Sequence, residues 1–292
     1  MYKTFTKPFT GTVLILAVSC VAFAQRGNRA PAAPDNRPFD AHDLSGYWFR
    51  DGGSRTIKGL KATDVPAMTP EGEAKLKANI PARGRDLGEP LKDEHYAYVR
   101  AVVPAKSNDP ILQCDPQGLP RLILDSEPTE WIQLPGRLLQ YFQWGHMLRE
   151  IWMDGRELPK GEQLDNLGTS WLGMSVGKWE GDTLVVNTVG FNDKSWLDIH
   201  GFPHTSDMRL EERYRRVSPD KIEYTFTIYD PKYYKTPWES DKKTWRRMAD
   251  KEVTYEGWKG FSGFLESYCV WSTENEFNER VENPAGIGKK TR

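Results

Sequence analysis

The sequence has little excess charge, few cysteines and no long apolar run after its first residues. Forty basic residues stand against forty-one acidic ones, a net charge of −1, which argues against nucleic acid or an anionic membrane as the main partner. Beyond residue 24 no run approaches the roughly eighteen apolar residues that a membrane-spanning helix needs. We therefore expect no transmembrane helix in the mature chain.

Several catalytic motifs are also missing. There is no Gly-x-Ser-x-Gly segment, and neither Cys114 nor Cys269 has the sequence context of a nucleophile, which disfavours covalent hydrolysis by serine or cysteine. Glycine-rich phosphate loops of the Rossmann or Walker kind are absent as well. We therefore expect no nucleotide cofactor. If the protein is an enzyme, we expect it to work without any cofactor.

The composition is that of a folded protein. Hydrophobic residues make up 38% of the chain, aromatic residues 12% and charged residues 28%, which is enough apolar material for a core and excludes a disordered scaffold. The 292 residues fit one large β domain or two average domains.

The first residues are typical of a secretion signal. Lys3 and Lys7 precede an apolar stretch from Val13 to Val18, and Ala22-Phe23-Ala24 forms a cleavage site. We predict a signal peptide over residues 1–24, and a periplasmic or secreted mature protein. An alternative is a lipoprotein, because Ala17-Val18-Ser19-Cys20 resembles a lipoprotein cleavage box and would place a lipid anchor on Cys20.

Cleavage after Ala24 leaves Cys114 and Cys269. An even pair in an oxidising compartment favours a disulfide bond between them. The alternative is two buried free thiols that pack as small apolar residues.

The rest of the chain divides into a leader, a domain and a tail. Residues 25–42 lack apolar periodicity, which predicts a disordered leader. We expect residues 43–275 to form the folded domain and residues 276–292 to form a flexible tail. Thr69 followed by Pro70 and an acidic first turn predicts a short helix to about Asn79. The segment from Ile80 to Pro110 predicts a long surface excursion.

From Arg121 onward the pattern is one of short strands separated by turn residues. Pro135-Gly136, Asp154-Gly155 and Glu180-Gly181-Asp182 are typical hairpin connections. The expected strands are Trp131–Leu134, Arg137–Gln143, Met147–Met153, Met174–Trp179, Thr183–Val189, Met208–Arg215, Ile222–Ile228, Lys242–Met248 and Phe264–Trp271. Successive hairpins with one short helix predict a mostly β fold, a single antiparallel meander that closes into a barrel; a β-sandwich is the alternative.

Two sets of motifs carry a resemblance. Trp179-Glu180-Gly181-Asp182-Thr183-Leu184-Val185-Val186 and Gly190-Phe191-Asn192-Asp193, with Trp196, Asp198, Gly201-Phe202-Pro203-His204 and Glu212-Arg213, resemble a large family of secreted bacterial proteins whose function is not characterised. The resemblance covers about Asp43 to Asn275, and it transfers no catalytic residues.

Asp43-Leu44-Ser45-Gly46-Tyr47-Trp48 resembles the Gly-x-Trp opening of the lipocalins (calycins). That resemblance implies a lipocalin-like barrel whose tryptophan packs at the barrel floor against an arginine from late in the chain. Arg246 or Arg247 is the arginine expected there.

The loop from Asn192 to His204 gathers Asp193, Asp198, His200 and His204. Loops at barrel mouths often carry sites, and three interpretations compete. These side chains could bind a metal, although their spacing matches no metal motif and we predict no metal. His204 could act as an acid or base oriented by Asp193 or Asp198, while Arg149 holds an anion. Alternatively, the two aspartates cap turns and His204 packs in the fold.

The predicted strands carry further candidates. Tyr141, His146, Arg149 and Glu212 could face the barrel interior, but strand periodicity places His146 and Arg149 on opposite faces. A buried arginine needs a partner, so Arg149 and Glu212 are expected to form an ion pair, which is either structural or part of a site.

Tryptophans concentrate in the middle of the chain, where they either line a ligand cavity or pack the core. They are Trp131, Trp144, Trp152, Trp171, Trp179 and Trp196. The leading expectation is an exported lipocalin-like protein that binds a small apolar or aromatic ligand in a barrel cavity. Its expected ligand-binding residues are Tyr141, His146, Trp152, Trp171, Trp196 and Glu212. The alternative is a hydratase, isomerase or non-covalent hydrolase that uses His204 with Asp193 or Asp198.

Overall fold

The computed structural model describes residues 37–52, 56–58, 64–82, 106–125, 127–248, 264, 268–273 and 275–276. The chain divides into residues 1–36 and residues 37–292, and every described residue belongs to the second unit. The predicted signal peptide, most of the predicted leader, all of the predicted tail except Glu276, and most of the excursion between Ile80 and Pro110 lie outside the described residues.

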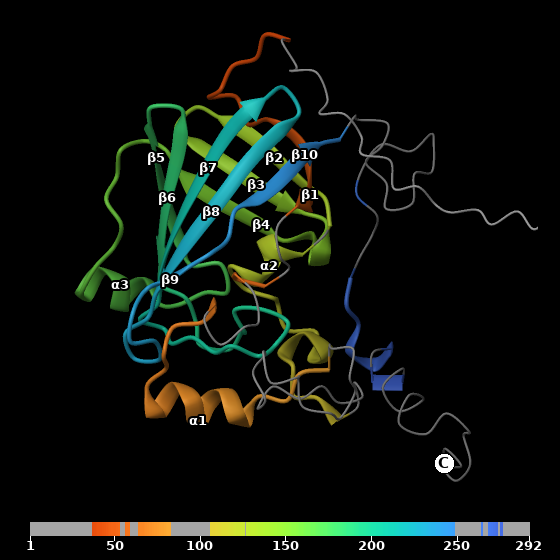
Figure 1. The fold of residues 1–292 in the computed structure, drawn as a ribbon, viewed down its shortest axis with the longest axis vertical. Helices are drawn as coiled ribbons and strands as arrows, with labels where there is room; N and C mark the ends of the chain where they lie inside the picture. Colours follow the sequence, from red (N-terminus) through yellow and green to blue (C-terminus); the bar gives the residue numbers. More distant parts are fainter. Residues whose placement is uncertain are drawn as a thin grey trace, which may run out of the picture. The chain divides into compact units, whose positions relative to one another are not determined.

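The strands follow the predicted hairpins closely, and short helices lie between them (Figure 1). The strands are β1 (Gly46–Gly52), β2 (Thr129–Leu134), β3 (Arg137–Phe142), β4 (Leu148–Trp152), β5 (Met174–Glu180), β6 (Thr183–Val189), β7 (Arg209–Ser218), β8 (Lys221–Tyr229), β9 (Trp238–Glu239) and β10 (Lys243–Arg247). The helices are α1 (Pro70–Ala78), α2 (Arg121–Leu124) and α3 (Glu162–Leu167), with 3-10 turns η3 (Pro110–Gln113) and η4 (Trp144–His146).

The sheet closes on itself. Strands β1 to β8 pair in sequence order, and β10 pairs with both β8 and β1, so nine strands form a closed barrel and the short β9 extends the edge of β8. Closure removes the exposed edges of an open sheet. The predicted mostly β barrel is therefore confirmed, and the alternative of two separate sheets is not adopted.

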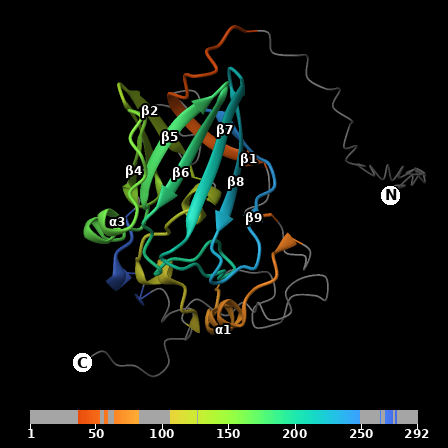
Figure 2. The same cartoon turned by 90° about the vertical axis from the view of Figure 1, so that its left-hand side faces the viewer.

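One pairing differs from the predicted antiparallel meander. Strands β4 and β5 are parallel and pair only through Ile151 with Ser175 and Trp152 with Val176. Parallel neighbours need a long crossover between them, and residues 153–173, which include α3, provide it. This ladder, with two residue pairs, is the shortest in the closed barrel. In Figure 2, β4 and β5 lie side by side, with α3 near their lower ends.

The predicted helix is confirmed as α1. It begins at Pro70, and the Thr69 hydroxyl oxygen accepts a hydrogen bond from the Gly72 backbone N–H at 3.1 Å, as an N-cap residue does. Helices α2 and α3 were not predicted. The predicted strand from Phe264 to Trp271 is wrong at its described residues, because residues 264 and 268–270 are not in a strand and Trp271 begins a helical turn.

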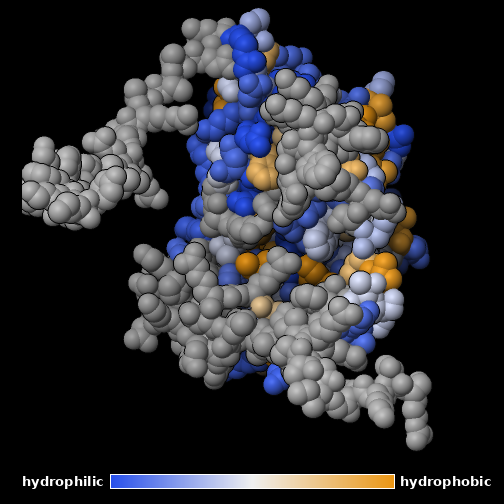
Figure 3. Space-filling view, turned by 90° about the vertical axis from the view of Figure 1, so that its right-hand side faces the viewer, coloured by the Kyte–Doolittle hydropathy of each residue, from blue (hydrophilic) through white to orange (hydrophobic). Residues whose placement is uncertain are grey.

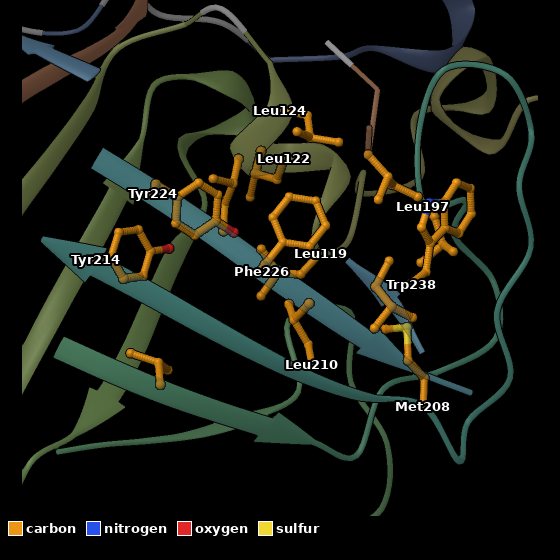
Figure 4. Close-up of a cluster of buried hydrophobic side chains, with 14 of the residues drawn as sticks. Leu119, Leu122, Leu124, Leu197, Met208, Leu210, Tyr214, Tyr224, Phe226 and Trp238 are labelled. Atoms are coloured by element: carbon orange, nitrogen blue, oxygen red, sulfur yellow. The ribbon is translucent and has the colours of Figure 1, made fainter. Parts of the chain in front are cut away.

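Aromatic side chains fill the barrel interior. The rings of Tyr214 and Tyr224 stack at 4.5 Å between centroids, and Trp131 packs edge-on against Tyr214 at 4.8 Å and against Trp245 at 5.6 Å. Full burial of each large apolar side chain contributes about 1.5–3 kcal/mol. Leucines of the α2 region close the lower end: Leu119, Leu122 and Leu124 meet Leu210 and Phe226 of the strands (Figure 4).

The Gly-x-Trp tryptophan does pack against an arginine, but not the expected one. The Trp48 indole N–H donates to the Leu44 carbonyl at 2.8 Å, and the guanidinium over its ring, at 5.6 Å, belongs to Arg216 of β7. Arg216 is buried because it occupies an inward position of β7, whereas the Arg246 guanidinium lies over Phe49.

Cys114 and Cys269 are joined by a disulfide bond, with their Cα atoms 5.2 Å apart. The predicted pairing is confirmed, and it ties the end of η3 to the segment at residues 268–273.

Candidate functional site

The most polar feature of the barrel interior is an ion pair between Arg149 of β4 and Glu212 of β7. Alternation along β4 turns Arg149 and Ile151 inward and leaves Leu148 52% exposed, as the sequence pattern predicts. The Arg149 side chain is 1% exposed and the Glu212 side chain 0%. Nη1 of Arg149 donates to Glu212 Oε1 at 3.0 Å and Nη2 donates to Oε2.

The remaining N–H groups of Arg149 bond to other strands. Nε donates to the Ser175 hydroxyl at 3.1 Å, Nη1 to the Gln140 side-chain oxygen at 3.0 Å, and Nη2 to the Thr188 hydroxyl at 2.9 Å. All five donors of a guanidinium are therefore engaged inside the protein. Arg149 has no donor left to hold a substrate anion, so the pair is structural, and the catalytic role predicted for Arg149 is not supported.

Two tyrosines complete the shell around Glu212. The hydroxyls of Tyr214 and Tyr224 donate to Glu212 Oε1 at 2.8 and 3.3 Å. Burial, together with nearby negative charge, raises the pKa of both tyrosines well above 10, so they remain proton donors. Burial alone would lower the pKa of Arg149, but the charge of Glu212 outweighs it and raises that pKa. The network thus connects side chains of β3, β4, β5, β6, β7 and β8, and within it the charge of Glu212 balances that of Arg149.

A cleft of about 400 Å³ opens beside this network, where β4 and β5 separate. Its floor includes Arg149 and Ser175 of the network. Its lining is mainly apolar and comes from Met147, which precedes β4, from β4 itself, from the 170–173 loop and from β5. The lining residues are Met147, Leu148, Arg149, Glu150, Trp152, Ser170, Trp171, Leu172, Gly173, Met174 and Ser175.

Two of the predicted ligand-binding tryptophans lie in this lining. Trp152 and Trp171 are both partly exposed. The Arg156 guanidinium stacks over the Trp152 ring at 3.7 Å and that of Arg137 lies at 5.9 Å, contacts that hold an indole through cation–π attraction. The two arginines therefore help to fix the position of the Trp152 ring.

The other predicted ligand-binding residues lie elsewhere. Tyr141 and His146 hydrogen-bond to each other, and His146 stacks on Tyr268 with ring centroids 4.9 Å apart. Trp196 is buried, with the Arg121 guanidinium 5.8 Å from its ring. Glu212 is sealed in the network. None of these four side chains lines the cleft, so the six predicted residues are divided among four places.

His204 is held inside the fold by both ring nitrogens. Nδ1 lies 3.1 Å from the Thr205 carbonyl oxygen and Nε2 lies 2.9 Å from the Ser195 hydroxyl. A carbonyl can only accept, so Nδ1 carries the proton and Nε2 accepts from Ser195. Burial lowers the pKa of His204, which keeps the ring neutral. Gly118 covers the hydroxyl, since a Cβ there would lie 2.2 Å from the Ser195 oxygen.

Neither predicted carboxylate is bonded to His204. Asp193 is exposed, and Asp198 is buried, with Oδ1 accepting from the His200 backbone N–H at 2.8 Å. Burial raises the pKa of Asp198. The structure thus does not form the predicted acid–base pair, and Asp198 caps the turn as the structural alternative proposes. No cluster of three potential metal-ligand side chains is found within the described ranges.

The sequence interpretation missed most of the residues that build the site. Ser175 and Thr188 are polar residues at inward positions of β5 and β6, and their hydroxyls lie 3.0 Å apart. The alternation of inward and outward residues along β5 and β6 could have identified these two polar residues as buried. Leu172 and Gly173 were not recognisable, because they reach the cleft through the parallel pairing of β5 with β4.

Comparison of this chain with protein-family models, with curated proteins and with solved structures found no match. Its class therefore comes from its architecture: a mostly β protein with a closed nine-strand barrel and a few short helices, consistent with a lipocalin-like barrel. No helix in the part of the chain that the structure describes is long and apolar enough to cross a membrane.

Proposed function

We propose that this protein is an exported binding protein whose cleft between β4 and β5 takes a small ligand with an apolar or aromatic body. The cleft of about 400 Å³ carries the proposal. Small-molecule sites commonly measure about 300–1,000 Å³ and combine an apolar lining with a few polar groups.

The chemistry of the lining selects an uncharged body. Met147, Leu172 and Met174 offer flexible apolar surface, and methionine adapts to ligands of different shape. Trp171 offers a flat face for stacking, whereas the Trp152 ring already stacks with the Arg156 guanidinium. Arg149 contributes no free charge, since Glu212 neutralises it. Burial of apolar area is therefore the main source of affinity.

The position differs from the expected cavity inside the barrel. Trp131, Tyr214, Tyr224 and Trp245 occupy the lumen, so we place the ligand at the side of the barrel, above the Arg149 network. A barrel filled by side chains cannot take a ligand of this size in its centre without unpacking them.

One polar group on the ligand would be oriented by the backbone of β4. Phe142 donates its N–H to the Met147 carbonyl at 2.8 Å, so alternation turns the backbone groups of Leu148 away from β3 and toward the cleft. The ladder to β5 begins only at Ile151. These groups are available to a carbonyl or an N–H of the ligand.

Export is supported by independent features. The segment over residues 1–24 has the composition of a secretion signal, and the Cys114–Cys269 bond is of the kind that persists in oxidising compartments. The resemblance to secreted bacterial proteins agrees with both, and anchoring through Cys20 remains part of this proposal.

The test is titration of the mature protein with N-phenyl-1-naphthylamine, a neutral aromatic probe that fluoresces in apolar surroundings. Leu148→Glu places a charge in the lining at a residue that is already 52% exposed, so the fold should tolerate it. We expect saturable binding to the wild type and at least a tenfold weaker Kd in the variant.

Leu134→Glu is the matched control, because Leu134 is 37% exposed, ends β2 and does not line the cleft. It should bind the probe as the wild type does. Absence of saturable binding to the wild type, or equal binding by the two variants, would contradict the proposal.

A further inference from the structure

A second cleft, of about 770 Å³, lies at the opposite end of the barrel from α2, beside the β7–β8 turn. That end is at the top in Figures 1 and 2, and the upper part of the face in Figure 3 is mainly hydrophilic. The lining residues are Arg37, Pro38, Phe39, Asp40, Asp43, Arg216, Pro219, Asp220, Arg247 and Met248. None of them lines the β4–β5 cleft.

Arg247 is one of three arginines that line this cleft. Among the described residues its guanidinium forms no hydrogen bond and no ion pair; its backbone N–H bonds to the Asp220 carbonyl at 2.9 Å. Arg247 pairs with Trp48 across β1 and β10, and directly opposed residues point to the same face of a sheet. Since Trp48 is buried in the barrel, Arg247 leans over the barrel end.

Gly46 determines where the Arg247 guanidinium lies. Its φ of +120° is accessible to glycine, and a Cβ at this position would lie 3.1 Å from Nη2 and 3.2 Å from Nε of Arg247. The guanidinium therefore rests flat against the backbone of β1, and the missing side chain is what makes room for it.

A second guanidinium lies in the same cleft, whose lining carries three arginines and three aspartates. Arg216 is buried and donates to backbone carbonyls, to Pro219 at 2.7 Å, to Ser218 at 3.4 Å and to Asp43. Its nearest carboxylate oxygen, on Asp43, is 3.7 Å away. Burial, and after it the charge of Arg247, lower the pKa of Arg216, while the charges of Asp43, Asp220 and Asp40 oppose that shift.

The acidic residues of the lining are already engaged. Asp40 and Asp43 each accept a backbone N–H at 2.9 Å, from His42 and Ser45, and Asp220 pairs with Arg37. These carboxylates are thus committed to the loop that covers the barrel end, and none of them bonds to Arg247.

We propose that this cleft is an anion-binding site, in which Arg247 holds a carboxylate or phosphate group of a small molecule. A guanidinium presents two parallel N–H donors that match either group. Phe39, which is 39% exposed and lies 5.5 Å from the Arg216 guanidinium, gives a ligand ring or chain an apolar neighbour.

The experiment is calorimetric titration of the full mature chain with inorganic phosphate and, separately, with benzoate, supported by the shift in Tm. Arg247→Gln removes the charge but keeps a polar side chain. Arg246→Gln is the matched control, because Arg246 is the exposed neighbour on the outer face of β10. We expect one anion to bind the wild type and Arg246→Gln equally, and Arg247→Gln at least tenfold more weakly.

Binding of phosphate alone would assign a phosphate ligand, and binding of benzoate alone a carboxylate with an apolar body. If Arg247→Gln does not fold, as judged by circular dichroism, Arg247→Lys keeps the charge without the two-point geometry and should weaken binding at least threefold. Failure of both anions to bind the wild type, or equal binding by wild type, Arg247→Gln and Arg247→Lys, would overturn the proposal. Neither result affects binding of the neutral probe at the β4–β5 cleft.

Discussion

Arg149 of β4 and Glu212 of β7 form a two-point ion pair inside the barrel, and neither side chain is more than 1% exposed. The pair joins strands on opposite sides of the β4–β5 seam, the shortest ladder in the closed barrel. It therefore supports the wall of the candidate cleft without offering a donor to the ligand.

The first prediction concerns this pair. Glu212→Gln removes the negative charge and leaves the Arg149 cation buried without compensation, which should lower the free energy of unfolding by about 3–5 kcal/mol. Urea unfolding followed by circular dichroism measures it. Glu150→Gln is the control, since Glu150 pairs with Arg137 at the surface, where both side chains are about 40% exposed, and should cost less than about 1 kcal/mol. Equal effects would show that the buried pair is not structural.

The second prediction concerns pH and His204. Burial lowers the pKa of His204 in the folded protein from the ordinary 6.5, so the unfolded chain binds the proton first as the pH falls. Stability should therefore decrease as the pH drops below about 6.5, and level off once the folded ring is protonated too. His204→Gln should flatten this part of the curve, in urea unfolding measured between pH 7.5 and 4.5.

His204→Ala should in addition cost about 1–3 kcal/mol near neutral pH, since it leaves the buried Ser195 hydroxyl without its partner. An unchanged slope in His204→Gln would mean that other groups carry the pH dependence.

The third prediction concerns the disulfide bond between Cys114 and Cys269, which are 155 residues apart in the sequence. Opening a loop of that length increases the entropy of the unfolded chain, and the paired change Cys114→Ser with Cys269→Ser should cost up to about 5 kcal/mol. Mass spectrometry before and after reduction establishes the bond, and thermal unfolding with and without reductant measures its effect. A reductant that leaves the Tm of the wild type unchanged would contradict the stabilising role.

Local features determined much of the fold. Two-residue periodicity and turn residues located β2 to β8, because each hairpin depends on neighbours in the chain. The same periodicity separated the two faces of β4, but only the structure shows that the face with Arg149 is the inward one. If the predicted signal peptide is removed, only one cysteine pair is possible, Cys114 with Cys269.

The candidate sites depend on contacts between segments that are distant in the sequence. A two-residue periodicity predicts on which face of a strand a side chain lies, but not which side chains it contacts there. The candidate cleft lies beside the parallel pairing that places Ser175 next to Ile151. The crossover that permits this pairing has no sequence pattern that predicts it. His204 is bonded by Ser195 and Thr205 rather than by a carboxylate, because the fold of the loop sets which group comes within hydrogen-bonding distance. Closure of the barrel likewise brings Arg216, not Arg246 or Arg247, over the Trp48 ring. Arg216 lies on β7 and Trp48 on β1, and these strands belong to one closed sheet only because β10 pairs with both β1 and β8.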